Sequence, residues 1–110
     1  MTDIPELTPT QFCERWPLEN RQKVTLLDVR EATELEIASL QDTKHIPMMQ
    51  IPVRLHELSR DNPLVVICHS GGRSRRVSEF LLSSGFSSVF NLTGGIDAWS
   101  QEIDASIPRY

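Results

Sequence analysis

The sequence predicts an α/β protein folded as one domain, and three features of the chain lead to this prediction. Its 110 residues have room for a single hydrophobic core. Hydrophobic residues make up 39% and charged residues 24%, the balance of an ordinary globular protein. Short apolar runs alternate with segments of helical periodicity, which is the order that forms βαβ units and a parallel sheet covered by helices on both faces.

Three apolar runs have the composition of strands. The run 63–68 contains Leu-Val-Val-Ile without alternation, so both of its faces should be buried inside a parallel sheet. Residues 24–29 are rich in β-branched and aliphatic side chains and end in charged residues. Residues 89–92 complete the set as a last, shorter strand.

Helices are expected between these strands. Thr8 is expected to cap the first one, with Pro9 at the first helical position, where a missing N–H costs nothing. The others are predicted over residues 31–40, 51–58, 73–84 and 95–101. The helix 73–84 is expected to end before Gly85 and to bury one face, made of Val77, Phe80, Leu81 and Ser84.

Charge and hydropathy disfavour several classes of partner. The net charge of −4 and the pI near 5.3 argue against general nucleic-acid binding, so any anion must bind at a local basic site. No run approaches the ~20 apolar residues of a membrane helix. Residues 1–6 have neither the basic region nor the apolar core of a signal peptide. The expectation is therefore a cytoplasmic protein with no membrane partner.

The two cysteines, Cys13 and Cys68, are too few for a disulfide framework, and no CxxC pair suggests a zinc or other metal site. Cys13 lies in the first predicted helix, and we interpret it as structural. A role as a resolving thiol for Cys68 is the alternative.

The segment that carries chemistry follows the buried strand and precedes a helix. It consists of Cys68, His69, Ser70, Gly71, Gly72, Arg73 and Ser74. At this place in an α/β sheet, free N–H groups and the helix dipole attract an anion, and the two glycines allow the backbone to curl. The arginine adds a fixed positive charge. The pattern predicts an activated sulfur nucleophile facing an anionic substrate. A core cysteine beside an ordinary Gly-Gly turn is the alternative.

Three blocks in this chain match one known family. C-x-x-G-x-R-S matches residues 68–74, L-L-D-V-R-E with a later Glu matches residues 26–34, and N-L-x-G-G-I-x-A-W matches residues 91–99. On these blocks the chain resembles single-domain rhodaneses over residues 4–104, within one domain spanning 1–110. The resemblance implies a rhodanese-like fold with a mostly parallel sheet of about five strands. Residues 38–43 depart from the family's G-H-I-x-G-A block, which puts the shape of the substrate entrance in doubt, and His45 is out of register to replace the lost histidine.

The resemblance also implies a reaction. Cys68 would take a sulfane sulfur from a small anionic donor such as thiosulfate, hold it as a persulfide, and pass it to cyanide, a low-molecular-weight thiol or a protein. The loop residues 69–74 would bind the substrate, and no metal or organic cofactor is needed. A sulfur carrier or sensor without turnover is one alternative. A cysteine-dependent phosphatase or arsenate reductase is another, but these use C-x5-R, whereas Cys68 and Arg73 are separated by four residues.

Several other residues have two interpretations. Asp28 and Arg30 end a strand, and we interpret them as a structural ion pair that supports the site, with a catalytic role as the alternative. Trp16 and Trp99 are expected to pack in the core. Arg75 and Arg76 are interpreted as solvated, and the alternative is that one of them contacts the donor or an acidic partner protein. Met48 and Met49 either fill a gap in the packing or line the substrate entrance. The segment 103–110 hints at a protein acceptor.

Overall fold

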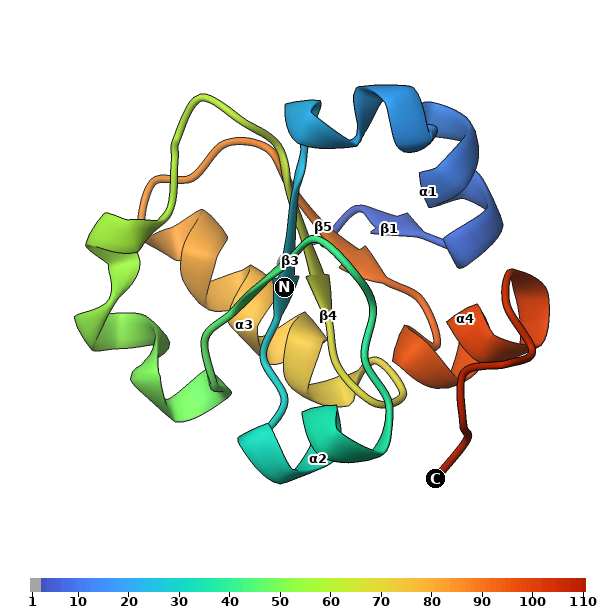
Figure 1. The fold of residues 1–110 in the computed structure, drawn as a ribbon. Coiled ribbons are helices and arrows are strands. Elements are labelled where there is room, and N and C mark those ends of the chain that lie inside the picture. The colour runs from blue at the N-terminus through green and yellow to red at the C-terminus, as the bar shows by residue number, and fades with distance from the viewer. Residues whose placement is uncertain (1–2) are drawn as a thin grey trace.

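A five-stranded sheet forms the centre of the computed structural model, which describes residues 3–110 (Figure 1). The strand order is β1-β5-β4-β2-β3, and every neighbouring pair runs parallel. The strands are β1 (Glu6–Leu7), β2 (Thr25–Asp28), β3 (Thr43–His45), β4 (Leu64–Ile67) and β5 (Val89–Leu92). The predicted α/β class with about five parallel strands is confirmed.

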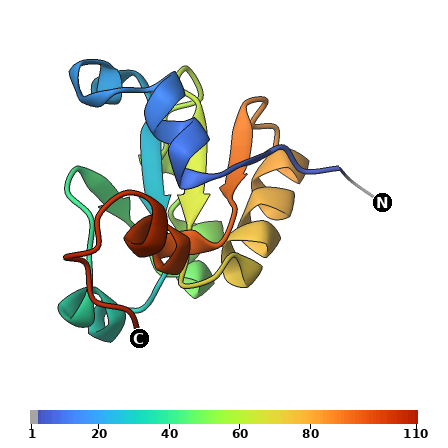
Figure 2. The same cartoon turned by 90° about the vertical axis from the view of Figure 1, so that its right-hand side faces the viewer.

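Helices cover both faces of this sheet. The α-helices are α1 (Pro9–Arg15), α2 (Ala32–Ile37), α3 (Gly72–Ser83) and α4 (Gly95–Glu102), and the 3-10 helices are η1 (Leu18–Lys23), η2 (Met48–Val53) and η3 (Leu55–Glu57). One core cluster joins the sheet to α3 and η2 through Val77, Leu81 and Ile51. A second cluster joins the other face to α1 and α4 through Phe12 and Trp99. Figure 2 shows α3 on one side of the strands, with α1 and α4 on the other.

The interior strands are those with the strongest apolar signal. All four residues of β4 are buried, as expected for a run without alternation that lies between two parallel neighbours. β2 and β5 fall within the predicted runs 24–29 and 89–92. The edge strands β1 and β3 have no separate sequence signal, because they contain only two and three residues and pair on one side each.

The start of α1 is confirmed, whereas the end of the second helix is not. Thr8 accepts a hydrogen bond from the N–H of Gln11, whose side chain binds the N–H of Thr8 in return. The prediction that the second helix reaches residue 40 is wrong, because α2 ends at Ile37. Ala38 is extended and buried in the core, and the chain then turns at Asp42 (φ 60°) to enter β3.

Two further helix predictions need correction. The segment 51–58 forms two 3-10 pieces, with Pro52 inside the first, where it removes a backbone donor. On α3 the buried residues are Ser74, Val77, Ser78 and Leu81. The prediction is wrong for two residues of this face: Phe80 is 39% exposed, and Ser84 is a half-buried residue that caps the end of the helix. Two small serines complete the buried stripe, and a count of apolar residues alone does not find them.

The carboxyl ends of the strands point to one edge of the sheet, at the bottom of Figure 1. The short helix α2, the first turns of α3 and α4, and the last residues of the chain gather at this edge (Figures 1 and 2). Within residues 3–110, no helix is long and apolar enough to cross a membrane. The same residues contain no group of three or more His, Cys, Asp or Glu side chains placed to hold a metal ion.

Candidate active site

The loop 68–74 lies at this edge, between the end of β4 and the first turn of α3. Gly71 caps α3 with φ 112°, in the left-handed region that favours glycine. Gly72 does not share this requirement, because a Cβ there would meet nothing within 4 Å and its φ is not positive. The expectation that both glycines curl the backbone is therefore correct for Gly71 and wrong for Gly72.

The sulfur of Cys68 lies at the base of the loop, in a residue that is only 1% exposed. The N–H of Gly71 donates to Sγ at 3.1 Å, and Oγ of Ser74 lies 3.3 Å from it. The Ser74 hydroxyl also contacts Oδ1 of Asn91 and the carbonyl oxygen of Gly71. Because this hydroxyl has one hydrogen and three acceptors in reach, it can turn its hydrogen toward a thiolate. Asn91, the first residue of the N-L-x-G-G-I-x-A-W block, thus contacts the loop, although it was not among the candidate site residues.

The backbone of α4 holds the start of the loop from the other side. The N–H of Ile96 donates to the carbonyl of Cys68 at 2.9 Å, and the N–H of Asp97 donates to that of His69 at 3.1 Å. A Cβ on Gly95 would lie 2.3 Å from the first carbonyl oxygen and 2.5 Å from the second, so only glycine fits there. Because the peptide bonds are trans, the N–H groups that follow these carbonyls, those of His69 and Ser70, point away from α4.

Several of the loop's N–H groups are available to a ligand. Within the described chain, the N–H groups of His69, Ser70, Gly72 and Arg73 have no hydrogen-bond acceptor, while that of Gly71 is directed at the cysteine sulfur. Unpaired N–H groups at a helix start favour a negative charge. The loop therefore presents a set of backbone donors around Cys68 that suits an anionic sulfur.

Arg73 ends the loop in a two-pronged ion pair with Glu34 of α2. Its terminal nitrogens donate to the two carboxylate oxygens at 2.6 and 2.8 Å. These hydrogen bonds lower the pKa of Glu34 to about 2. Asp28 is not a partner of Arg73, because it pairs with Arg30.

The pair of Asp28 and Arg30 is completely buried at the end of β2. Nε and Nη2 of Arg30 donate to the Asp28 carboxylate at 2.8 to 3.1 Å, and the backbone N–H of Arg30 donates to it at 3.0 Å. These contacts match the structural ion pair that the sequence analysis favoured. Nε2 of His45 lies 2.7 Å from the carbonyl oxygen of Arg30.

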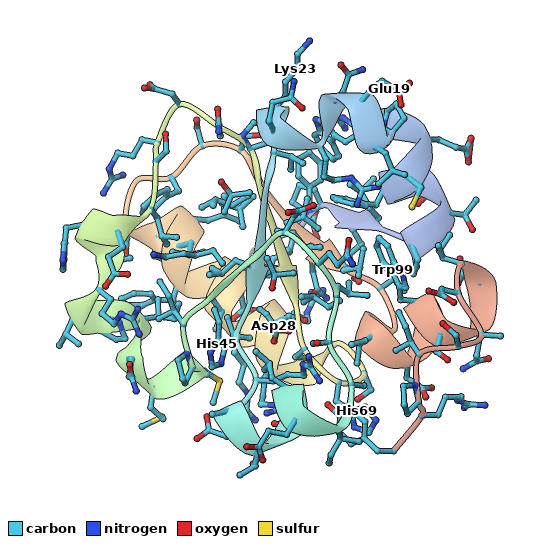
Figure 3. The ribbon with its side chains drawn as sticks, viewed as in Figure 1. Glu19, Lys23, Asp28, His45, His69 and Trp99 are labelled. Carbon is cyan, nitrogen blue, oxygen red and sulfur yellow. The ribbon has the colours of Figure 1, made fainter. Side chains whose placement is uncertain are left out.

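Tyr110 is the residue at this site that sequence reasoning missed. Its ring stacks on the ring of His69, with centroids 4.0 Å apart and planes 10° from parallel. Its hydroxyl accepts from Nη1 of Arg30 at 2.9 Å and donates to Oε2 of Glu34 at 2.8 Å. No local pattern marks this contact, although the segment 103–110 was noted. Figure 3 shows His69 beside these last residues, with Asp28 and His45 nearer the sheet.

Cys13 lies apart from this site. It packs on the core cluster of α1 and α4, whereas Cys68 belongs to the cluster on the opposite face of the sheet. Burial raises the pKa of the Cys13 thiol, and nearby Arg21 only partly offsets this. These positions favour the structural interpretation of Cys13 over that of a resolving thiol.

Trp16 and Trp99 pack as expected, each within 5.6 Å of the Phe12 ring centroid. Figure 3 shows Trp99 near α4, away from His69.

The remaining candidates do not reach the sulfur. Met48 and Met49 line a hollow of about 210 Å³ between η2 and α3, and Cys68 is not part of its lining. Arg75 pairs with Glu6 at 3.0 Å. Arg76 borders the same hollow and has no carboxylate partner among residues 3–110. Its role as a contact for an acidic partner stays a prediction.

Comparison with known proteins places this geometry in a family. The model of the rhodanese-like domain matches residues 16–102. The chain belongs to the rhodanese family. A sulfurtransferase from Allochromatium vinosum is 36% identical over 84 residues, covering 76% of this chain and 78% of that protein. The thiosulfate sulfurtransferase GlpE from Actinobacillus pleuropneumoniae is 31% identical over 96 residues, covering 87% and 86%.

Other rhodaneses show the same domain alone and within larger proteins. A rhodanese-related protein from Thermoplasma volcanium superimposes with a TM-score of 0.78 at 31% identity, covering 90% of this chain and 93% of that one. A chloroplastic rhodanese-like/PpiC domain-containing protein from Arabidopsis thaliana is 46% identical over 89 residues. That match covers 77% of this chain but only 30% of the relative, so the rhodanese is one part of a longer protein.

Proposed function

We propose that this rhodanese transfers sulfane sulfur through a persulfide on Cys68, with thiosulfate or a similar small anion as the donor. The observation that supports this most directly is the arrangement of unpaired N–H groups around Cys68. A persulfide places one negatively charged sulfur beyond Sγ. In this proposal, the unpaired backbone donors of the loop stabilise that charge as an oxyanion hole stabilises oxygen.

The donor step balances without a cofactor. The Cys68 thiolate attacks the outer sulfur of thiosulfate, a new S–S bond forms, and the S–S bond of thiosulfate breaks. Sulfite leaves with the electron pair, and the enzyme holds Cys68–S–S⁻. The N–H of Gly71 and the Ser74 hydroxyl, 3.1 and 3.3 Å from Sγ, stabilise the attacking thiolate.

The acceptor step returns the enzyme to its starting state. A nucleophile such as cyanide attacks the terminal sulfur, and the thiolate of Cys68 leaves. Cyanide then departs as thiocyanate, and a thiol acceptor departs as its own persulfide. We propose that a small thiol or a thiol-bearing protein fills this role in the cell, which we expect to be the cytoplasm.

Mass spectrometry of the purified protein after thiosulfate treatment tests the assignment. We expect a gain of one sulfur on the peptide that contains Cys68, and its loss as thiocyanate after cyanide is added. Cys68→Ser should abolish both, whereas the matched variant Cys13→Ser should keep most of the activity. Sulfur on Cys13, or equal loss from both variants, would contradict a single persulfide on Cys68.

The same experiment separates an enzyme from a sulfur carrier. A carrier would load sulfur on Cys68 once and release it slowly. An enzyme would produce thiocyanate over many cycles. We expect many cycles, because the donors that hold the persulfide also stabilise the thiolate that leaves.

A further inference from the structure

One aromatic side chain is linked to both ends of the loop that holds Cys68, to His69 by direct contact and to Arg73 through Glu34. The ring of Tyr110 stacks on His69, the second residue of the loop. Its hydroxyl donates to Glu34, whose carboxylate holds Arg73 near the loop's other end. Tyr110 is also the chain's only tyrosine, which makes it accessible to selective labelling.

The hydroxyl has a defined direction. It lies between Nη1 of Arg30, which can only donate, and a carboxylate oxygen of Glu34, which can only accept. The single hydroxyl hydrogen is therefore committed to Glu34. This is the fourth hydrogen bond to a carboxylate that already accepts two from Arg73 and one from the N–H of Glu31. Its geometry restricts where Glu34, and with it the guanidinium, can lie.

The segment that carries Tyr110 is anchored by contacts that do not involve the ring. Arg109 pairs with Asp97 at 2.8 Å, and Oγ of Ser100 donates to the carbonyl of Ile107 at 2.6 Å. Ile107 also packs against the core cluster of α1 and α4. The segment therefore stays in place when the Tyr110 side chain is changed, so the effect of the ring can be measured separately.

We propose that Tyr110 is a positioning residue for the donor step. It orients His69 through the stack and orients Arg73 through Glu34, so that both ends of the loop are set for an anionic sulfur donor. This inference rests on the proposed function, because it assigns Tyr110 to the first half of that reaction. Cyanide attack on the persulfide does not depend on how an anionic donor is held, so the acceptor step is little affected.

Steady-state kinetics with thiosulfate and cyanide test this assignment. Tyr110→Phe keeps the stack and loses the hydroxyl, and should raise the KM for thiosulfate about 3- to 10-fold while the KM for cyanide changes less than twofold. Tyr110→Leu loses both contacts and should raise the thiosulfate KM further. The matched control is Ser106→Ala in the same segment, because the Ser106 hydroxyl is exposed and hydrogen-bonds only to Asp104 among residues 3–110. It should match the unchanged protein.

A measurement that does not depend on steady-state rates gives a second readout. Replacing the single tyrosine by 3-fluorotyrosine places one fluorine nucleus beside His69. We expect its NMR signal to shift when thiosulfate loads sulfur on Cys68, and to return after cyanide is added.

The outcomes distinguish this inference from the proposed function. If the unchanged protein gains no sulfur on Cys68, the proposed function fails. If it gains sulfur but the fluorine signal stays constant and both Tyr110 variants keep the thiosulfate KM, the positioning role alone is overturned. Equal increases in both KM values, together with a lower melting temperature, would assign Tyr110 a purely structural role and overturn it as well.

Discussion

At the scale of single residues, Glu34 connects the loop to α2 and to Tyr110. Its carboxylate accepts two hydrogen bonds from Arg73, one from the Tyr110 hydroxyl and one from the N–H of Glu31. Arg73 is thus part of an ion pair and not an isolated cation. Its charge is compensated by Glu34, and the backbone N–H groups of His69, Ser70, Gly72 and Arg73 remain without an acceptor among residues 3–110.

This environment predicts a specific loss of stability in acid. Hydrogen bonds from Arg73 lower the pKa of Glu34 from 4.5 to about 2 in the folded protein. A carboxylate with a lowered pKa stabilises the fold above its unfolded pKa, and this contribution is lost as the pH falls through the folded value. The loss should therefore occur between pH 4.5 and about 2, and it should amount to about 2 to 3 kcal/mol.

Denaturant unfolding of variants isolates this contribution. Glu34→Gln lacks the titrating group, so its free energy of unfolding should fall less than that of the unchanged protein between neutral pH and about pH 3. Glu36→Gln on the same helix is the matched control, because Glu36 is exposed and has no hydrogen-bond partner among residues 3–110. Parallel pH curves for all three proteins would contradict the role given to Glu34.

At the scale of elements, the start of α4 and the loop 68–74 form one unit. Two N–H groups of α4 bind the first two carbonyls of the loop, and Gly95 allows this close approach. The first turn of α3 then completes the loop, with Gly71 as its cap. The site is built where three elements meet, so its geometry depends on how α4 packs as much as on the loop's own residues.

Two glycine substitutions test this dependence. Gly95→Ala places a Cβ against two carbonyl oxygens at a residue with φ 60°, so it should cost roughly 2 kcal/mol or more of stability. By displacing the loop it should also lower sulfur transfer about 100-fold. Gly72→Ala meets no neighbour within 4 Å and should change the unfolding free energy by less than about 1 kcal/mol. Similar destabilisation by both changes would argue against the close approach.

The length of the loop predicts that a phosphate ester is not a substrate. Four residues separate Cys68 from Arg73, and donors that converge on one sulfur are too close together to reach three phosphoryl oxygens at ~2.9 Å each. We expect negligible hydrolysis of p-nitrophenyl phosphate. A glycine inserted between Gly72 and Arg73 should widen the loop and lower sulfur transfer. Steady phosphate release by the unchanged protein, absent in Cys68→Ser, would favour the phosphatase alternative.

At the scale of the whole molecule, the sheet separates the two core clusters and, with them, the two cysteines. The cluster of α3 and η2 contains Cys68, and the cluster of α1 and α4 packs against Cys13, on the opposite face. A relay between the two thiols would have to pass through or around the sheet. The buried pair of Asp28 and Arg30 sits at the carboxyl edge, where it connects the end of β2 to Tyr110 and so to the site.

The sequence by itself determined the α/β class, the interior strands β2, β4 and β5, the cap at Thr8 and the loop that carries Cys68. These features depend on local composition or on periodicity within one segment. Both can be read without knowing which other segments pack against it. The tertiary structure decided the partner of Arg73, which lies 39 residues away, and the contact of Tyr110 with Glu34, 76 residues away. It also ended α2 at Ile37 and buried two serines of α3. Each of these depends on which distant segments the fold brings together, and packing between such segments leaves no periodic signal in the chain.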